Sequence, residues 1–341
     1  MLGADLIIPE TMKKVIIILS AIIMIISLCA CGNNVKESSG TTSENNGSVQ
    51  TEAKTNTPVS ESAAKENGTT ENEKTTSVSE TASIGEQIEG NEGLAISEHN
   101  SECIITGLGT CNEKDLIIPS HYNGKPVKMI DEEAFRGTSI TSVIIPWTVE
   151  KVDEDAFEGC SALASVTFSE GMLSISDAAF ADCVSLKEVV LPKSLIGIGR
   201  SAFEGCVSLE KATFLGAVRI GNRAFDMCSS LKSVVIKGES DNDCYLENNV
   251  FSGCVSLESF SALKGLKQIG TWSFADCASL KTVYLPDSLS DIKSCAFLRS
   301  GVEKVFYSGS KEEWEKIKIE AQNDPITSAE IQYEVSPIDL Y

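Results

Sequence analysis

The chain has 341 residues, of which 42% are hydrophobic and 23% are charged, so it is long enough for two ordinary domains. Its 49 acidic and 28 basic side chains give a formal net charge of −21 at pH 7. This balance argues against a nucleic-acid partner, because affinity for a phosphate backbone comes from clustered Lys and Arg.

The N-terminal residues predict an export signal. Lys13-Lys14 precede the apolar run Val15–Leu28, which is too short for a comfortable membrane span and fits the apolar region of a signal peptide. The next residues, Leu28-Cys29-Ala30-Cys31-Gly32, resemble the bacterial lipobox, in which cleavage before the last Cys leaves a diacylglycerol on it. We therefore expect residues 1–30 to be a lipoprotein signal peptide and Cys31 to be the lipid attachment site. A plain signal peptide or an uncleaved anchor is the alternative. Because acidic side chains precede it, Met12 is the expected true start.

Residues 31–92 are predicted to be a disordered tether. They are mostly Ser, Thr, Glu, Asn and Lys with almost no aromatic residues, and such a segment cannot bury enough apolar surface to offset the entropy lost on ordering. As a flexible coil, the stretch of about 58 residues from Asn33 to Gly90 spans roughly 40 Å, or at most about 190 Å when extended. A thicker cell wall would hide the rest of the chain from large external partners.

The remainder of the chain repeats a unit of about 23 residues. Each unit has an aliphatic anchor followed five residues later by Phe, as in Ile175 and Phe180. The eight pairs are Ile130/Phe135, Val152/Phe157, Ile175/Phe180, Ile198/Phe203, Ile220/Phe225, Leu246/Phe251, Ile269/Phe274 and Ile292/Phe297. A fixed period with atypical end units is typical of a solenoid, because one coil cannot bury its own apolar face and must stack on its neighbours.

Each unit also carries the pattern Leu-x-x-Val-x-Leu, as in Leu186, Val189 and Leu191. Its alternation of apolar and other residues predicts a short strand with one buried face. Pro192 follows directly and ends the strand, because proline has no backbone N–H to donate. Stacked coils would align these strands into one parallel sheet.

The run from Cys183 to Cys206 resembles the BspA-like leucine-rich repeats of bacterial surface proteins. It reads Cys-x-x-Leu-x-x-Val-x-Leu-Pro-x-x-Leu-x-x-Ile-Gly-x-x-Ala-Phe-x-x-Cys. The resemblance covers about Gly93 to Tyr341. It implies a leucine-rich repeat solenoid over residues 93–307, β-rich, right-handed and of α/β type, with a parallel sheet on one face and short turns or helical segments on the other. A closing Gly-x-x-x-Glu-Trp block similar to that of the family implies a C-terminal cap at residues 308–341.

Both ends of the array are expected to be covered. The segment Leu94–Pro126 could be a recognition loop, but a cap over the first coil's open apolar face is the favoured interpretation, since solenoids need such caps. At the other end, Ser310–Glu313 matches a helix capping box. Trp314 is expected to be buried against the last coil, and Ile331 and Tyr333 alternate like a closing strand.

Six units carry a Cys three residues after the Phe, namely Cys160, Cys183, Cys206, Cys228, Cys254 and Cys277. Such a row of cysteines could serve a metal or redox role, or could simply pack in the core. Their spacing follows the repeat and contains no Cys-x-x-Cys pair, which is unusual for zinc. We therefore expect a ladder of packed thiols. Outside it, Cys103 and Cys111 are the best candidates for a disulfide, although the unbonded state is favoured.

Other motifs are better explained without chemistry. Gly197–Ala202 matches a dinucleotide-binding fingerprint, but it is the repeat's own sequence and no crossover helix follows. Asp153–Asp155 is expected to be a solvated turn. The insertion Glu239–Asp243 could bind calcium through oxygen ligands, with an ordinary polar loop as the favoured alternative. The two histidines, His99 and His121, accompany no catalytic motif. We predict no enzymatic activity, no cofactor and no metal site.

The outward positions of the predicted strands form the candidate binding face. They mix small hydroxyl, β-branched and aromatic side chains, and solenoids commonly recognise partners with such a surface, although strand propensity alone also gives a β-branched row. The candidate residues are Glu188, Val190, Lys211, Thr213, Val235, Tyr284, Lys304 and Phe306.

These features together predict a non-catalytic protein anchored by lipid to the outside of a bacterial cell membrane and displayed at the cell surface. The repeats imply binding to a macromolecule, for adhesion or protein–protein interaction. By resemblance, the partner is a protein or glycan on a host, matrix or microbial surface. The alternative is a cell-envelope scaffold that binds glycan or another envelope protein, which is favoured if the tether cannot clear the wall.

Overall fold

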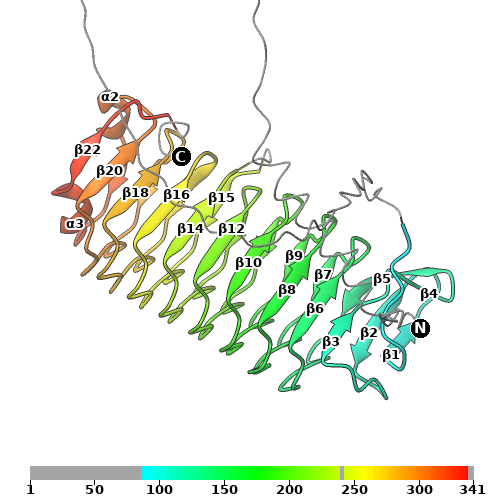
Figure 1. Ribbon diagram of the computed structural model, residues 1–341. Helices are drawn as coiled ribbons and strands as arrows, with labels where there is room; N and C mark the ends of the chain where they lie inside the picture. Colours follow the sequence, from blue (N-terminus) through cyan, green and yellow to red (C-terminus); the bar gives the residue numbers. More distant parts are fainter. Residues whose placement is uncertain (1–85, 239–241, 337–341) are drawn as a thin grey trace, which may run out of the picture. The chain divides into compact units, whose positions relative to one another are not determined.

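The computed structural model describes residues 86–238 and 242–336, which form a stack of coils (Figure 1). The predicted solenoid is confirmed: parallel strands follow one another along the stack, and helix is confined to two single-turn segments of the described chain. The predicted signal peptide, Cys31 and almost all of the tether lie outside the described residues.

The Leu-x-x-Val-x-Leu segments form the predicted parallel sheet, which we call the long-strand sheet. It runs in two sections, β3-β6-β8 and β10-β12-β14-β16-β18-β20-β22. The strands are β3 (Asp115–Ile117), β6 (Ser142–Ile145), β8 (Ser165–Phe168), β10 (Glu188–Leu191), β12 (Lys211–Phe214), β14 (Ser233–Ile236), β16 (Ser259–Ala262), β18 (Thr282–Leu285), β20 (Lys304–Tyr307) and β22 (Glu330–Gln332). The second and fourth residues of a strand point inward, as shown by the burial of Val189 and Leu191.

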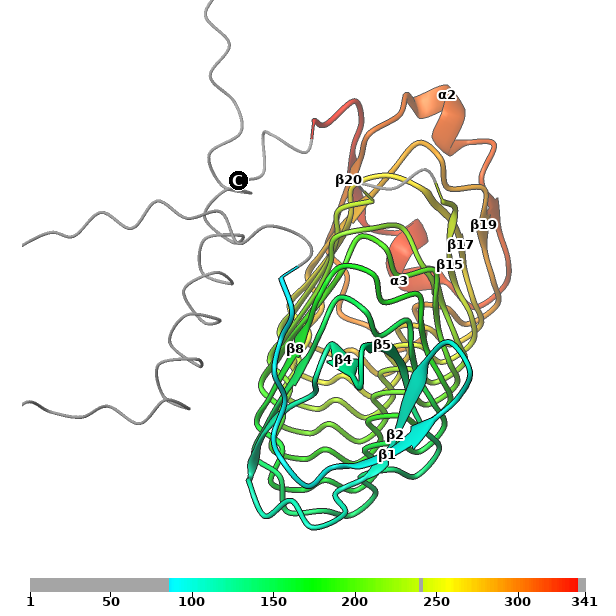
Figure 2. The same cartoon turned by 90° about the vertical axis from the view of Figure 1, so that its right-hand side faces the viewer.

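The aliphatic anchors form a second parallel sheet, the short-strand sheet, where the sequence predicted turns. Its repeat strands are β5 (Lys125–Ile130), β7 (Lys151–Val152), β9 (Ser174–Ile175), β11 (Gly197–Ile198), β13 (Arg219–Ile220), β15 (Cys244–Leu246), β17 (Leu266–Ile269), β19 (Asp291–Ile292) and β21 (Lys318–Ile319). Seen along the stack, β8 and β20 lie on one side and β15, β17 and β19 on the other (Figure 2). The core therefore lies between two ladders.

A tight turn around each Phe connects the two sheets. The residue two positions before each of the eight repeat Phe residues has a left-handed backbone with φ between 49° and 58°, at Glu133, Asp155, Ala178, Ser201, Arg223, Asn249, Trp272 and Cys295. None of these is glycine, so each turn carries a conformational cost. Backbone hydrogen bonds between coils hold it in place, as where Phe157 N–H donates to Ala179 O at 2.8 Å.

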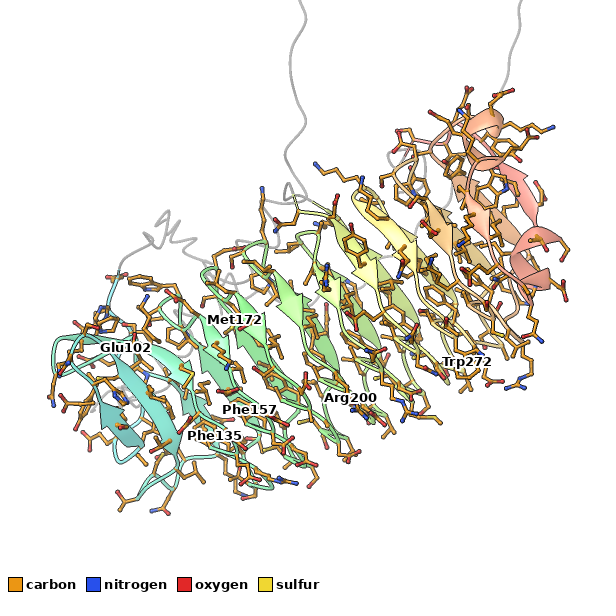
Figure 3. The ribbon with its side chains drawn as sticks, turned by 180° about the vertical axis from the view of Figure 1, so that it is seen from behind. Glu102, Phe135, Phe157, Met172, Arg200 and Trp272 are labelled. Carbon is orange, nitrogen blue, oxygen red and sulfur yellow. The ribbon has the colours of Figure 1, made fainter. Side chains whose placement is uncertain are left out.

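The Phe rings form one continuous column through the core. All eight, from Phe135 to Phe297, are fully buried, and successive ring centroids lie 4.9 to 5.5 Å apart in stacked geometry. Figure 3 shows Phe135 and Phe157 on neighbouring coils. This spacing is close to that of adjacent strands, so a side chain that recurs at one coil position stacks on itself.

The repeated cysteines pack beside this column, as predicted. Each ladder thiol, from Cys160 to Cys277, is fully buried and donates a hydrogen bond to the carbonyl oxygen of the Phe one coil before its own, at 3.0 to 3.2 Å. Burial raises the pKa of these thiols. All ten described cysteines, including Cys103 and Cys111, are free.

The segment before the repeats covers the first coil. Strand β1 (Ala95–Glu98) pairs antiparallel with β2 (Cys103–Gly107), and β4 (His121–Tyr122) forms a hairpin with β5. The hairpin turn is Asn123-Gly124, with φ of 49° and 76°, as an Asn-Gly turn favours. The free edge of β3 is bonded by an earlier stretch of chain, where Asn91 N–H donates to Ile117 O at 2.9 Å.

The C-terminal segment closes the other end. Helix α2 (Lys311–Trp314) begins at the predicted capping box, in which Ser310 and Glu313 bond each other's backbone N–H. The prediction for Trp314 is also confirmed, because its ring is buried edge-on against Tyr307, with centroids 5.2 Å apart. Beyond it, β21, α3 (Asp324–Thr327) and β22 add one further strand to each sheet. No helix within residues 86–238 and 242–336 is long and apolar enough to cross a membrane.

Candidate binding face

The first and third residues of the four-residue strands point outward and lie in two columns across the long-strand sheet. The register pairs Glu188 with Lys211, whose charged groups lie 3.7 Å apart. It also places Val190 beside Thr213 and Thr213 beside Val235. Five of the eight predicted residues are thus neighbours on β10, β12 and β14. We call this group of five residues the open face. Val190, Thr213 and Val235 lie at its centre and are half-buried.

Two further predicted residues lie near the C-terminal end of the same sheet. On β20, the Lys304 ammonium nitrogen is 5.7 Å from the centroid of the Phe306 ring, which is cation–π distance. Lys304 also lies 3.7 Å from the Glu330 carboxylate on β22. Phe306 remains half-exposed and can still contact a partner.

The prediction that Tyr284 is exposed is wrong. Tyr284 points outward from β18, but only 1% of its surface is accessible, because the chain turns back over it after β22. Its hydroxyl donates to Val335 O at 2.9 Å. This returning segment is itself fixed, since Val335 N–H donates to Tyr307 O at 3.1 Å and Glu334 N–H to Gly309 O at 2.9 Å. The returning segment therefore separates the open face from Phe306.

A column of charged side chains, not predicted from the sequence, lies beside the face. The residue before each strand alternates in sign along the stack, in the order Lys187, Glu210, Lys232, Glu258, Lys281, Glu303. Lys232 Nζ lies 2.7 Å from Glu210 Oε2, and Lys281 pairs in the same way with Glu303. The hydrogen bond from Lys232 holds the pKa of Glu210 below its usual value. Aligning the residue that follows each repeat Leu would have revealed the alternation.

The other motifs do not assemble into a reactive site. Asp153 pairs with Lys151 Nζ at 2.9 Å and accepts the Glu154 N–H, as expected of a solvated turn. His121 packs against Trp147, with ring centroids 6.0 Å apart. Gly197–Ala202 lies on β11 and the turn after it.

The predicted calcium alternative falls partly outside the described residues, because residues 239–241 are not described. Asp243, from the same insertion, pairs with Lys267 Nζ at 3.5 Å. In the part of the chain that the structure describes, no three His, Cys, Asp or Glu side chains are grouped so that they could hold a metal ion.

The fold and the face define a leucine-rich repeat solenoid with an outward-facing parallel sheet. A family model described as "BspA type Leucine rich repeat region (6 copies)" matches residues 128–245 and 244–339, so the chain belongs to this family. The expected resemblance is therefore confirmed.

Solved structures of other leucine-rich repeat proteins are similar to this chain, and these include the following three. A leucine-rich repeat protein of T. pallidum has 29% identity and a TM-score of 0.49, with 55% of this chain and 88% of that one covered. One from Bacteroides ovatus has 23% identity and a TM-score of 0.45, with 74% and 79% covered. One from Eubacterium ventriosum has 26% identity and a TM-score of 0.46, with 60% and 50% covered. The search of curated proteins gave no match.

Proposed function

We propose that this chain is a lipid-anchored, cell-surface leucine-rich repeat protein that binds a macromolecular partner and catalyses no reaction. The observation that carries the proposal is the open face, where Val190, Thr213 and Val235 lie side by side on a rigid parallel sheet. Membership of the BspA-type family supports protein–protein interaction as the mode of action.

The dimensions of the face indicate what a partner must contact. The three strands that carry it, β10, β12 and β14, at about 4.8 Å each and four residues at about 3.3 Å, give a surface roughly 14 Å by 13 Å, or about 180 Å². A standard interface buries about 800 Å² on each partner. The bordering charge column, for example Glu210 and Lys232, must therefore contribute, so a partner with alternating charges is favoured over an apolar one.

The anchor and location in this proposal rest on the sequence. Lys13-Lys14, the apolar run and Cys31 predict export and lipid attachment, and the tether sets the reach of the solenoid to at most about 190 Å. The ligand class that we propose is a protein or glycan on a host, matrix or microbial surface.

Protease or antibody access to the solenoid on intact cells tests the location. We expect the solenoid to be reached on whole cells, and a Cys31→Ala variant to be released into the medium because it lacks the lipid. If the solenoid is reached only after the wall is removed, the alternative function replaces this one: an envelope scaffold that binds glycan or a neighbouring envelope protein.

A binding screen against matrix and host proteins tests the face itself. The double variant Thr213→Arg, Val235→Arg places two large cations on half-buried outward positions, and we expect it to weaken partner binding at least about tenfold by steric and charge mismatch. The matched control is Gln268→Arg, an outward substitution on the short-strand sheet. Equal affinities of both variants and the parent, at unchanged melting temperature, would move the binding site off the open face.

A further inference from the structure

The outer face of the short-strand sheet, on the opposite side of the core from the open face, carries a shallow depression of about 390 Å³. It lies over β9, β11 and β13, and its lining includes Asp177, Gly197, Arg200, Arg219, Asn222 and Glu247. Its volume falls at the lower end of the range for small-molecule sites, roughly 300 to 1,000 Å³. Figure 3 shows Arg200 on the central part of the stack.

The floor of the depression is backbone that no side chain covers. Gly197 lies between Ser174 and Arg219 in the register of the sheet. A Cβ at Gly197 would meet nothing within 4 Å and its φ is not positive, so neither packing nor backbone geometry requires glycine there. Gly199 differs, because its Cβ would lie 2.5 Å from Asp177 N. Coil stacking therefore does not require glycine at position 197.

Two arginines from adjacent coils line the depression. Both are exposed, and the Arg219 guanidinium carbon lies over the Tyr245 ring, 5.2 Å from its centroid, which is cation–π distance. Within residues 86–238 and 242–336, no carboxylate forms an ion pair with Arg200 or Arg219. Elsewhere in the same region, Arg136 pairs with three carboxylates and Arg299 binds Asp276 through two nitrogens.

Carboxylates are abundant in this chain, whose net charge is −21, and within the described residues none forms an ion pair with these two arginines or with Arg223. Two guanidinium groups with available N–H donors form a ready site for a carboxylate, because the planar fork of arginine matches its two oxygens.

Fixed polar groups complete the rim. Asn222 Nδ2 donates to Glu247 Oε2 at 2.7 Å, and Asn222 Oδ1 accepts from Asn248 N–H at 3.1 Å, so the amide and the carboxylate are held in place. On the other side, Asp177 Oδ1 accepts a hydrogen bond from the backbone N–H of Arg200 at 2.7 Å, which leaves the Arg200 guanidinium outside this bond. The nearby aliphatic side chains, Ile175 and Ile198, are almost fully buried and offer little apolar surface. Fixed donors and acceptors of this kind suit the hydroxyl groups of a sugar.

We propose that this depression binds an acidic saccharide, with its carboxylate on Arg200 and Arg219 and its hydroxyl groups on Asp177 and Glu247. Because the site lies on the sheet opposite the open face, it is independent of the proposed function, and either can fail without the other.

Titration calorimetry of the purified solenoid with trigalacturonate, and with its fully methyl-esterified counterpart, tests the proposal. We expect saturable binding of the acid and at least about tenfold weaker binding of the neutral ester, because the ester lacks the charge-assisted hydrogen bonds. Equal binding of acid and ester would overturn the proposal, as would the absence of saturable binding at millimolar trigalacturonate.

Three variants locate the site. Arg219→Gln should weaken binding at least about tenfold, since it removes one guanidinium fork. Gly197→Leu should abolish binding at unchanged melting temperature, because the side chain fills open space above the floor. The control Arg223→Gln removes an exposed arginine of the same coil that does not line the depression, and binding should be unchanged. If Arg223→Gln weakens binding as much as Arg219→Gln, the attraction is unspecific and the proposal is wrong.

Discussion

Single polar side chains join each coil to the next. Asp177 accepts the backbone N–H of Arg200 at 2.7 Å, and Asn248, at the same position three coils later, accepts that of Thr271 at 3.1 Å. Similarly, the Ser194 hydroxyl donates to Met172 O at 2.8 Å. These bonds satisfy backbone groups that the short strands leave unpaired, which explains how two-residue strands remain in register.

Because Tyr284 is buried, its substitution is expected to change the stability of the fold rather than partner binding. Because its ring is buried and its hydroxyl bonds Val335 O, Tyr284→Phe should lower the free energy of unfolding by about 0.5 to 1.5 kcal/mol. Tyr284→Ala should lower it by about 3 to 5 kcal/mol by leaving a cavity. Urea denaturation measures both. Phe306→Ala, at a half-exposed neighbour in the register, is the control and should cost clearly less. A Tyr284→Ala variant as stable as the parent would show that the returning segment does not cover the ring.

At the scale of elements, the thiol ladder links stability to alkaline pH. Burial raises the pKa of Cys206 and Cys228 well above the ordinary value of 9.0. The folded chain therefore keeps protons that the unfolded chain releases above pH 9. Stability should be insensitive to these thiols below about pH 8 and should fall as pH rises above 9, by about 1.4 kcal/mol per pH unit for each thiol.

The double variant Cys206→Ala, Cys228→Ala isolates this effect. Lysines and tyrosines also titrate in this range, but their contribution cancels in the difference between variant and parent. We expect the parent to lose about 2.7 kcal/mol more per pH unit than the variant above pH 9, measured by urea unfolding at several pH values. Parallel pH profiles for the two proteins would mean that these thiols ionise as readily folded as unfolded.

The elements that could be predicted from the sequence are those that repeat a side chain. The Phe column, the thiol ladder and the long-strand sheet each place one kind of side chain at one coil position. Because equivalent positions of adjacent coils lie side by side, these side chains contact one another. The short-strand sheet could not be predicted, because strands such as β9 have two residues and carry no alternation of polar and apolar side chains.

The candidate site was predicted less completely than the fold. Outward positions such as Val190 and Thr213 follow from strand alternation, so their neighbourhood could be foreseen. Tyr284 could not, because the segment that covers it follows the last strand and matches no repeat. The depression at Gly197 was also hidden, since a glycine required by packing, such as Gly199, looks the same in sequence as one that leaves open space.

At the scale of the whole molecule, stability passes from coil to coil along one axis. Phe203 lies at the centre, with ring centroids 5.2 Å from Phe180 and 5.0 Å from Phe225. Phe203→Ala should lower the free energy of unfolding by about 3 to 5 kcal/mol and should speed amide hydrogen exchange in the coils on both sides. An equally stable variant would contradict the repeat register.

Substitutions at the ends of the stack should lower the free energy of unfolding as much as substitutions at its centre. The reason is that a terminal coil has backbone groups that a further coil would otherwise bond. At the C-terminal end, the side chain of Asn323, only 2% exposed, makes the hydrogen bonds that a further coil would otherwise make. Its Oδ1 accepts the Phe297 N–H at 3.1 Å, where every earlier repeat Phe N–H donates to a backbone carbonyl of the next coil. Its Nδ2 donates to Lys293 O and to Glu320 O, both at 2.9 Å.

Asn323→Ala should therefore lower the free energy of unfolding by about 2 to 4 kcal/mol, since one buried N–H group and two partly buried carbonyl groups lose their partner. Asn323→Asp keeps the acceptor for Phe297 N–H but loses the donors, so its loss should be smaller. The control Asn248→Ala removes one exposed bond and should cost about 1 kcal/mol or less. Hydrogen exchange at the Phe297 amide should accelerate in Asn323→Ala and remain slow in Asn323→Asp. Equal protection of that amide in Asn323→Ala and in the parent would show that the stack closes without this side chain.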